Sequence, residues 1–480
     1  MLLSSRFLWK LLIAILSLRL LTLGLYPLMD TSEARYGEMA RKMVELQDWI
    51  TPMYDYGVPF WGKPPLSFWS QAAAIQLFGV NEFAVRFPAW LFHVLSCVLI
   101  IRLGREVKDE QTGLLAAVIY SSTALGLVAS GVVLTDPALG FSILLAFYGF
   151  WRGMLDGDRF WARMGFVGLG LGLLAKGPLV LVLFGLSALA WTAFNQRWLE
   201  LIKLPWVSGL AIMLVVAVPW YVIAEIKTPG FLDYFLVGEH WKRYVISKWS
   251  GDLYGSAHAQ PLGTIWLNLF QALLPWVFFL PMIWFYQKSQ KSQSISGWQS
   301  YLWCWALSAP LFFTMAGNIL WTYVLPALPA WALLLSQGIR ESRRSFPLLV
   351  AGVSLLVPGL LFAVIIEGSF MDRSRNQMPV VKYWENVSQQ KKGELYYLKR
   401  FYSADFYSAG KVKKLDIESG INQQNAFYLA VPEDKCQQTM KEEFSECSLS
   451  ATLSRTDLWF CPASESQTAY LSKDGEDKSI

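Results

Sequence analysis

Charged side chains are scarce in this chain, and they stand mainly between apolar segments. Of the 480 residues, 54% are hydrophobic and only 16% are charged. The residues that could do chemistry in these intervening stretches are Asp30, Glu33, Arg35, Lys63, Asp136, Lys176, Glu239, His240, Arg243 and His258. Lysine and arginine hold phosphate groups and stabilise growing negative charge, and a carboxylate can act as a general base. The combination predicts a reaction on a phosphorylated lipid.

The acidic candidates also have structural explanations. Asp30 could cap the helix that follows it, with Glu33 completing a capping-box-like pair, and one residue could serve both purposes. Asp136 precedes Pro137, a common signal for the start of a helix. Capping and catalysis are therefore both open for these residues.

The context of Lys63 favours phosphate binding over snorkelling, and that of Lys176 favours a functional role over a purely structural one. Lys63 precedes Pro64-Pro65, which forces an extended backbone and keeps the lysine out of a helix. Lys176 interrupts an apolar hairpin, where an unpaired charge is costly. His240 and His258 are two of only three histidines, but a pair alone is a weak metal signal and packing roles are more common.

Composition shows what kind of scaffold must position these residues. A mean hydropathy of +0.35 and 23 tryptophans are typical of a polytopic membrane protein with aromatic belts at its interfaces. The basic residues are scattered rather than gathered on one stripe, which argues against nucleic-acid binding. Arg19 interrupts the first apolar run and no clear cleavage site follows, so we expect an uncleaved membrane helix rather than a signal peptide.

The sequence predicts an all-α bundle of roughly eleven spans. Apolar segments begin near residues 11, 88, 112, 138, 164, 179, 206, 262, 301, 319 and 346. The loops that the positive-inside rule places in the cytoplasm carry Arg102, Arg105, Lys108, Arg152, Arg159, Arg163, Arg197, Lys203, Lys288, Lys291, Arg340, Arg343 and Arg344. Segments that start and end inside are hairpins, so Asp136, Lys176 and Asn318 lie near outer tips. The N-terminus falls inside, and the loop 224–261 falls outside.

An amphipathic helix is expected in the first outer loop, residues 30–86. Apolar residues recur at helical spacing from Tyr36 to Val44. The other face carries Arg35, Glu38, Lys42 and Glu45. The pattern predicts a juxtamembrane helix lying in the outer interface rather than a span.

The chain is expected to divide into a membrane catalytic domain, 1–369, and an outer soluble α/β domain, 370–480. The tail contains a predicted helix in "PVVKYWENVSQQ" and strand-like runs in "GELYYLKRFY" and "NAFYLAV". Of five cysteines, Cys436, Cys447 and Cys461 lie in this tail, where one disulfide would leave one thiol over. Cys97 and Cys304 lie in apolar segments and are expected to be inert.

Seven ordered motifs carry a resemblance to a known family. They are "MDTSEARYGEMARKM", "DWITPMYDYGVPFWGKPPLSFW", "FGVNEFAVRFPAW", "TDPAL", "LAKGPL", "GEHWKRY" and "TYVLPALPAWALL". The set resembles the lipid-carrier-dependent glycosyltransferases of the protein mannosyltransferase superfamily, and within it the bacterial lipid A aminoarabinose transferase group. The resemblance spans nearly the whole membrane part, whereas the tail resembles that group only in position and size.

The resemblance implies a GT-C fold and a sugar donor linked to polyprenyl phosphate. It makes Asp30 and Glu33 candidates for the base or for orienting the acceptor, and Asp136 the second acidic motif. The residues that it implies for the donor phosphate are Lys63, Arg35, Lys176, Arg243 and Tyr323.

Three positions depart from the family pattern. Ser32 stands where the aminoarabinose transferases have an aspartate, so Asp30 or Glu33 would have to act in its place. Gly62 stands where they have a glutamate that can bind a metal, so the sequence gives only weak support for zinc or another divalent metal, and it indicates no other cofactor. "GNILWTY" also lacks a lysine that the group carries, which leaves the identity of the donor open.

Together these features predict an inverting glycosyltransferase at the outer face of the inner membrane. The expected acceptor is lipid A or another glycolipid, and a protein acceptor, as for the mannosyltransferases, is the alternative. A transporter or flippase of lipid-linked sugars should carry charges near the bilayer midplane and show internal repeats, and neither is evident. A partner-binding module on an inert anchor would leave the acidic and "KPP" motifs unexplained.

Overall fold

The structure is a computed structural model that divides into two compact units. It describes residues 4–255, 258–289, 297–342, 345–354, 376–415, 425–432, 444 and 446–463. The membrane unit comprises Met1–Leu25 and Lys42–Ala363, and the tail unit comprises Tyr26–Arg41 and Val364–Ile480. The domain boundary expected at residue 370 lies outside the described residues.

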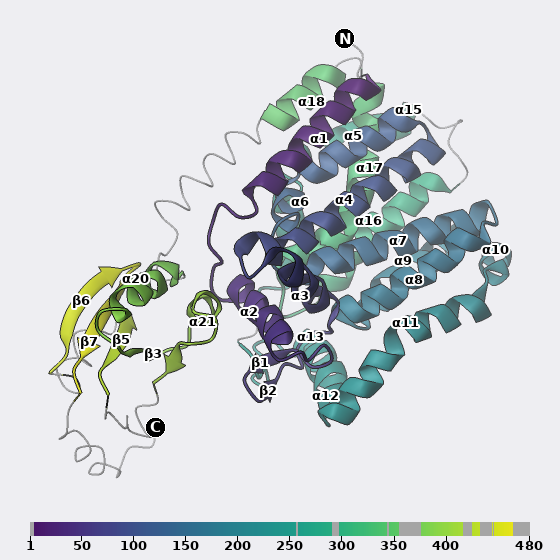
Figure 1. The fold of residues 1–480 in the computed structure, drawn as a ribbon. Helices are drawn as coiled ribbons and strands as arrows, with labels where there is room; N and C mark the ends of the chain where they lie inside the picture. Colours follow the sequence, from purple (N-terminus) through teal and green to yellow (C-terminus); the bar gives the residue numbers. More distant parts are fainter. Residues whose placement is uncertain are drawn as a thin grey trace. The chain divides into compact units, whose positions relative to one another are not determined.

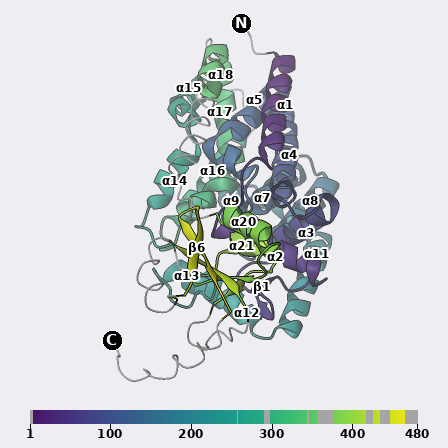
Figure 2. The ribbon, with the colours of Figure 1, turned by 60° about the vertical axis from the view of Figure 1, so that its left-hand side comes forward.

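Helices form nearly all of the described membrane unit (Figures 1 and 2). They are α1 (Ser5–Thr22), α3 (Leu66–Phe78), α4 (Glu82–Val107), α5 (Glu110–Ser122), α6 (Ala124–Ala129), α7 (Asp136–Leu155), α8 (Arg159–Lys176), α9 (Leu179–Phe194), α10 (Trp198–Lys203), α11 (Trp206–Lys227), α12 (Phe231–Asp233), α13 (Arg243–Val245), α14 (Thr264–Ala272), α15 (Pro281–Ser289), α16 (Trp298–Phe313), α17 (Leu328–Glu341) and α18 (Ser345–Ser354). A π-helix, η1 (Tyr234–Lys242), the 3-10 helices η2 (Trp276–Phe279) and η3 (Trp321–Ala327), and the strands β1 (Met53–Asp55) and β2 (Val58–Pro59) connect them.

The predicted hairpins agree with the observed helix bounds. α7 starts at Asp136 and packs against α8, which ends at Lys176. Gly177 adopts φ +71°, a left-handed conformation that stops α8, and Pro178 precedes α9. α16 packs against both α9 and α17. Chemistry-bearing side chains therefore stand where hairpins turn, at the ends of rigid helices.

The apolar helices fit a multi-pass membrane protein. Each of the eleven apolar segments contains a helix, but by length and composition only four of the described helices could cross a membrane, or five if a bent pair counts as one. The four are Glu82–Val107, Asp136–Leu155, Trp206–Lys227 and Trp321–Glu341, and the bent pair is Thr264–Ala272 with Trp276–Gln287. The total of about eleven spans thus stays a prediction.

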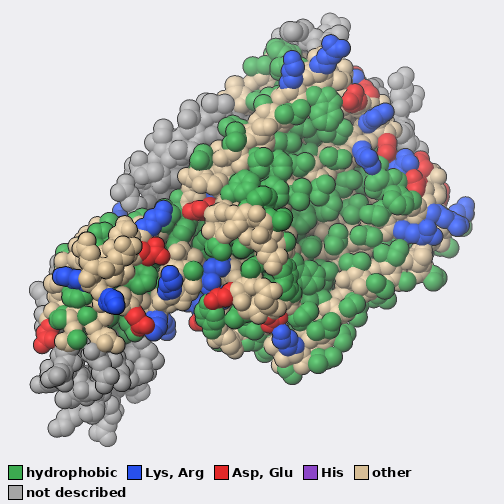
Figure 3. Space-filling model, in the orientation of Figure 1, with side chains coloured by type: hydrophobic (Ala, Val, Ile, Leu, Met, Phe, Trp, Pro, Cys, Tyr) green, Lys and Arg blue, Asp and Glu red, His purple; other side chains and the backbone are tan. Residues whose placement is uncertain are grey.

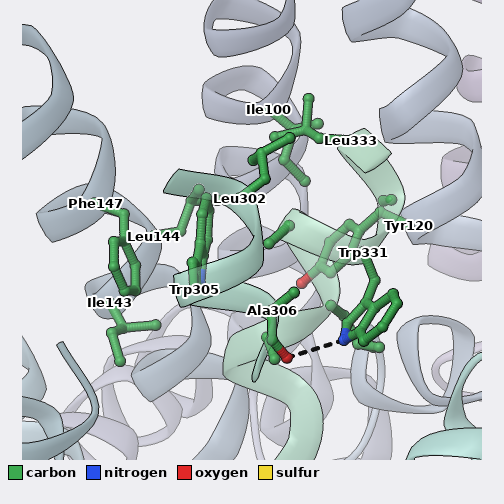
Figure 4. Packing of buried hydrophobic residues seen from close by; sticks show 14 of the residues in the cluster. Ile100, Tyr120, Ile143, Leu144, Phe147, Leu302, Trp305, Ala306, Trp331 and Leu333 are labelled. Carbon is green, nitrogen blue, oxygen red and sulfur yellow. Dashed lines mark hydrogen bonds between the residues drawn. The ribbon is translucent and has the colours of Figure 1, made fainter. Parts of the chain in front are cut away.

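Aromatic packing rigidifies the centre of the bundle. The rings of Phe147 on α7 and Trp305 on α16 stack with centroids 4.4 Å apart (Figure 4). The Trp331 indole donates a hydrogen bond of 3.0 Å to the carbonyl oxygen of Ala306. A buried indole needs such a partner, and the bond ties α17 to α16.

Basic loops that are distant in sequence meet at one end of these helices. Lys108 pairs with Glu341 at 2.5 Å, Arg340 pairs with Asp109, and Arg152 lies 3.6 Å from Glu106. On the face in Figure 3, a broad hydrophobic surface covers the helices, and lysine and arginine side chains gather at its margins. The pairing supports the expectation that these loops share one side of the membrane.

The tail unit contains a five-stranded sheet with the order β4-β3-β5-β7-β6. Its elements are α20 (Met378–Ser388), β3 (Glu394–Tyr397), α21 (Tyr402–Tyr407), β4 (Lys413–Lys414), β5 (Phe427–Pro432), β6 (Ser448–Leu453) and β7 (Thr456–Cys461). β3 runs parallel to β4 and β5, whereas β7 is antiparallel to β5 and β6. Val380 and Trp384 of α20 pack with Leu395 of β3 in one hydrophobic cluster.

The cysteines and the strands of the tail unit refine two expectations. Cys447 and Cys461 form a disulfide, and Cys436 lies outside the described residues. The run predicted as one strand, "GELYYLKRFY", forms β3 but then turns into α21. A local pattern could not show this helix, because its first amides are held by Asp30, more than 370 residues earlier.

The predicted amphipathic helix exists as α2 (Ser32–Glu45), but the prediction that its charged face is exposed is wrong for two residues. Tyr36, Met39, Ala40 and Met43 are buried as expected, yet Glu38 and Lys42 on the charged face are each only 1% exposed. Glu38 is compensated by Arg41, whose guanidinium lies 2.6 Å from its carboxylate. Ion pairing thus lets charged residues be buried that periodicity alone assigns to a surface.

Candidate functional site

Lys63 lies in a loop of the membrane unit that is held in place by hydrogen bonds from the side chains of a tryptophan and a tyrosine. The Trp61 indole donates to Thr228 Oγ1 at 3.1 Å, and the Trp61 amide donates to the hydroxyl of Tyr254 at 3.1 Å. Tyr254 in turn donates to the carbonyl oxygen of Pro59 at 2.9 Å. Pro65 then starts α3, so Lys63 stays outside the helix, as the two prolines predict.

Lys63 belongs to a chain of alternating charges. Its Nζ lies 2.8 Å from Glu239 Oε2, and Arg243 Nη1 lies 3.0 Å from Glu239 Oε1. The same Arg243 nitrogen is 3.2 Å from Asp252 Oδ2. Glu239 and Asp252 are nearly fully buried. Their contacts are therefore buried ion pairs, in which removing one partner would leave an uncompensated charge.

A π-helix positions two members of this chain. η1 spans Tyr234–Lys242, and Arg243 follows it directly. Its wider turn brings the backbone oxygen of Phe235 within 2.8 Å of Nδ1 on His240, five residues on. Such π-helical turns are rare and frequently occur at functional sites.

A second charge pair joins two hairpin ends. Lys176 Nζ lies 2.6 Å from Asp136 Oδ1 and 4.4 Å from the centre of the Tyr323 ring. Thr135, rather than Asp136, is the N-cap of α7, and the Asp136 carboxylate accepts a hydrogen bond from Lys176. The structure therefore favours an ion-pair role over a capping role for Asp136.

His240 connects the two groups of charges. Its Nε2 lies 3.0 Å from the backbone oxygen of Lys176, next to Gly177. A Cβ at Gly177 would come 2.6 Å from the Phe235 ring and 3.0 Å from His240 Cε1. Tyr323 lies beside Lys176. We call the whole set, Lys63, Asp136, Lys176, Glu239, His240, Arg243, Asp252 and Tyr323, the charge cluster.

The cluster shifts the titration of its members. Burial would raise the pKa of Glu239, but Lys63 and Arg243 outweigh it and lower the pKa to about 2. Burial lowers the pKa of His240, and a neutral ring can donate to only one of the two carbonyl oxygens beside it. Glu239 is therefore an anion held by cations, and His240 is a structural link rather than a base.

Asp30, Glu33 and Arg35 belong to the tail unit. Asp30 Oδ1 accepts hydrogen bonds from the Tyr402 amide at 2.8 Å and the Ser403 amide at 3.3 Å, and the Ser403 hydroxyl donates to Oδ2. Asp30 thus caps α21, a helix other than the one expected. Glu33 accepts a hydrogen bond of 3.4 Å from the Met29 amide, and the Arg35 guanidinium lies over the Tyr402 ring at 5.9 Å.

One predicted candidate, His258, lies outside the charge cluster, and two residues that contact Arg243 were not predicted as functional. His258 has an exposed side chain, and its backbone oxygen accepts from the Ile319 amide at 2.9 Å. Asp252 was not identified, because a single acid in a loop carries no motif. Asn318 was predicted only as a hairpin tip, but its Nδ2 donates to the backbone oxygens of Arg243 at 2.6 Å and Ile246 at 2.9 Å.

The residues present do not fit the metal site of the family. Gly62 offers no ligand, and a Cβ there would come 2.8 Å from the Phe60 ring. Among the described residues, no group of three or more His, Cys, Asp or Glu is arranged to hold a metal ion.

Comparison with known proteins supports the resemblance. The profile of the dolichyl-phosphate-mannose-protein mannosyltransferase family matches residues 4–235. The undecaprenyl phosphate-alpha-4-amino-4-deoxy-L-arabinose arabinosyl transferase 2 of Pseudomonas fluorescens (strain Pf0-1) is 29% identical over 365 residues, 75% of this chain and 63% of that protein. The corresponding transferase of Erwinia tasmaniensis is 29% identical over 328 residues, 67% of this chain and 57% of that protein. The chain therefore spans less than two thirds of the length of these relatives.

The fold has been seen in solved structures. ArnT from Cupriavidus metallidurans, bound to undecaprenyl phosphate, superposes with a TM-score of 0.79 at 17% identity, covering 95% of this chain and 98% of that chain. The apo form of the same protein gives a TM-score of 0.76 with the same coverage. At this identity the match concerns the fold alone, and it confirms the GT-C membrane architecture expected from the motifs. The chain is therefore similar in sequence to the mannosyltransferase family over residues 4–235, and it has the GT-C fold of these solved structures.

Proposed function

We propose that this chain is an inverting glycosyltransferase that moves a sugar from a polyprenyl-phosphate donor to an envelope glycolipid, lipid A or a related lipid, at the outer face of the inner membrane. The observation that carries the proposal is the charge cluster, in which cations from three separate loops come together at helix ends. The relatives named above are transferases that use an undecaprenyl-phosphate-linked sugar, which supports the same class of donor.

The cluster suits a donor whose leaving group is a phosphate. The bond from the anomeric carbon to the phosphate oxygen breaks, its electron pair goes to the phosphate, and an acceptor hydroxyl oxygen bonds to the opposite face of that carbon. Lys63, Lys176 and Arg243 stabilise the negative charge that grows on the phosphate. The sugar becomes oxocarbenium-like in this step, as in glycoside chemistry generally.

A carboxylate must orient the acceptor hydroxyl and take its proton. Asp136 is our first choice, because it lies in the charge cluster and Lys176 fixes its direction. Glu239 is held by two cations, and the carboxylate oxygens of Asp30 accept bonds from α21. Asp30 and Glu33, with Arg35, remain candidates for holding the acceptor from the first loop.

Transfer from a synthetic polyprenyl-phosphate sugar to lipid A tests the proposal. We expect Lys63→Ala to lower the rate by about 10²–10³-fold, the usual effect of losing one donor to a developing anion. Lys227→Ala is the matched control, since Lys227 pairs with Asp48 outside the charge cluster at 2.7 Å. Equal rates for wild type and Lys63→Ala would overturn the assignment. Transfer to a peptide alone would instead indicate a protein acceptor, and movement of the lipid without transfer would indicate a flippase.

A further inference from the structure

Each cation of the charge cluster already faces a carboxylate. Lys63 and Arg243 share Glu239, Arg243 also meets Asp252, and Lys176 meets Asp136. Three positive groups are thus matched by three negative groups. A lipid phosphate entering the cluster must therefore compete with carboxylates for the cations that would hold it.

Glu239 is the carboxylate that a phosphate would most directly replace. Its carboxylate contacts two different cations: Oε2 lies 2.8 Å from Lys63, and Arg243 Nη1 lies 3.0 Å from Oε1 and 3.2 Å from Oε2. The hydroxyl of Tyr234 also donates to Oε1 at 3.3 Å. Two oxygens on one phosphorus could bridge the same pair, because Lys and Arg bind phosphate and carboxylate oxygens in the same way. The Lys63 side chain is 19% exposed and that of Glu239 only 3%, so the cation is accessible while the carboxylate is not.

The competition matters most after transfer. A sugar-linked carrier has a phosphodiester with one negative charge, whereas the released carrier has a monoester with about −1.5 to −2 at neutral pH. Uncompensated cations would therefore hold the product more tightly than the donor, and slow release would limit turnover.

We propose that Glu239 is a built-in counter-ion for the carrier phosphate, which yields Lys63 and Arg243 to the donor and reclaims them to release the spent carrier. The inference rests on the proposed function and concerns the same site. Glu239 acts here through the two cations, so it is a positioning residue rather than a catalytic one. Glu239 lies on η1, and Arg243 follows four residues later on the same helical segment, so a change in the conformation of the Glu239 side chain alone can make or break both contacts.

Direct binding of undecaprenyl phosphate to the full-length protein in lipid nanodiscs tests this. We expect Glu239→Gln, which keeps size but removes charge, to bind the phosphate about 5–10-fold more tightly than wild type. Its KM for the polyprenyl-phosphate sugar and its kcat should both fall, with stronger inhibition by undecaprenyl phosphate. Glu239→Asp should restore affinity toward wild type, because it restores the charge. A merely structural glutamate would not tighten binding when changed.

The matched control is Glu225→Gln. Glu225 also accepts bonds, from the amides of Gly230 at 3.0 Å and Leu232 at 2.7 Å, but lies outside the charge cluster. Its variant should bind undecaprenyl phosphate as wild type does, and an equal tightening there would overturn the inference. So would unchanged or weaker binding by Glu239→Gln.

A second variant serves if Glu239→Gln does not fold. Asp252→Asn removes the other carboxylate on Arg243 and should tighten binding about 2–3-fold, and no change would again overturn the inference. Lys63→Ala separates the two proposals. If it abolishes binding while Glu239→Gln has no effect, the proposed function stands and the counter-ion role falls. If wild type itself does not bind undecaprenyl phosphate, both fall.

Discussion

Asp30 and Glu239 are both buried carboxylates, but they lie in different units and titrate in opposite directions. Burial raises the pKa of Asp30 to about 6, and bonds from Ser403 and Tyr402 offset this only in part. Glu239 is as buried, yet Lys63 and Arg243 lower its pKa to about 2. At Asp30 the amides and the hydroxyl satisfy the carboxylate oxygens without overcoming the cost of burial, whereas at Glu239 two full positive charges overcome it.

The difference separates two uses of an acid in this fold. The Asp30 carboxylate holds the first amides of α21 and so ties the start of the first loop to the tail unit. The carboxylates of the charge cluster instead hold cations at the ends of membrane helices. The second arrangement can exchange one anion for another, whereas the first cannot without exposing amides.

The largest effect is expected when the transfer rates of variants at Asp136 and Asp30 are compared. Asp136→Asn should lower the rate by about 10²–10⁴-fold, because an amide cannot take the acceptor proton. Asp30→Asn retains an acceptor for the α21 amides and should cost less than about tenfold. Initial rates in the lipid A assay, with thermal unfolding as the check on folding, decide between them. A larger loss for Asp30→Asn, or for Asp30→Asn combined with Glu33→Gln, would return the catalytic carboxylate to the first loop.

Short motifs predicted three residues of the charge cluster, and of its eight residues only Asp252 was not named from the sequence. Lysine before two prolines, aspartate before proline and lysine before glycine-proline each describe a helix end, and a helix end is a local property. Lys63 could therefore be named and placed in the first outer loop, and Asp136 and Lys176 could be placed at the outer tips of hairpins. Their mutual distances could not, because they depend on how the helices pack.

The contacts that were missed have no local sequence pattern, and most of them are long-range. Asp252 meets Arg243 within a loop that has no periodic pattern, and Asn318 holds the backbone of Arg243 from 75 residues away. Asp30 was a candidate both for catalysis and for capping the helix that follows it, but its carboxylate caps α21, 372 residues later. A side chain that satisfies distant backbone amides leaves no trace in the spacing of its own segment.

The next effect tests how closely the site depends on backbone contact. Gly177→Ala should destabilise the membrane unit by about 2 kcal/mol, since φ is +71° and a Cβ would press on Phe235 and His240. Gly185→Ala is the control, because a Cβ there meets nothing within 4 Å. Thermal unfolding in detergent measures both. Equal stability of the two variants would show that the link between His240 and α8 is loose.

A smaller effect is expected at the junction within the tail unit. Asp30→Ala removes the acceptor of the Tyr402 and Ser403 amides and should lower the local stability of α21 by about 1–2 kcal/mol. Glu394→Ala removes an exposed carboxylate paired with Lys413 at 2.7 Å and should change stability by less than about 0.5 kcal/mol. Hydrogen exchange of the α21 amides reports the difference. Unchanged exchange in Asp30→Ala would show that the cap is dispensable.

The smallest effect is a pH dependence confined to the same junction. The pKa of Asp30 is raised from 3.8 to about 6 in the folded protein, so the folded state binds a proton more readily than the unfolded state between those values. The free energy of unfolding of α21 should therefore increase by about 1 kcal/mol as pH falls from 7 to 5. Raising the pH through 6 reverses this change, so the added stability is lost. Hydrogen exchange corrected for its intrinsic pH dependence measures this. Asp30→Asn should abolish the trend, and a trend that persists in the variant would assign it to another group. Glu239 provides the contrast, because its pKa of about 2 leaves it ionised throughout this range and the charge cluster should not respond through it.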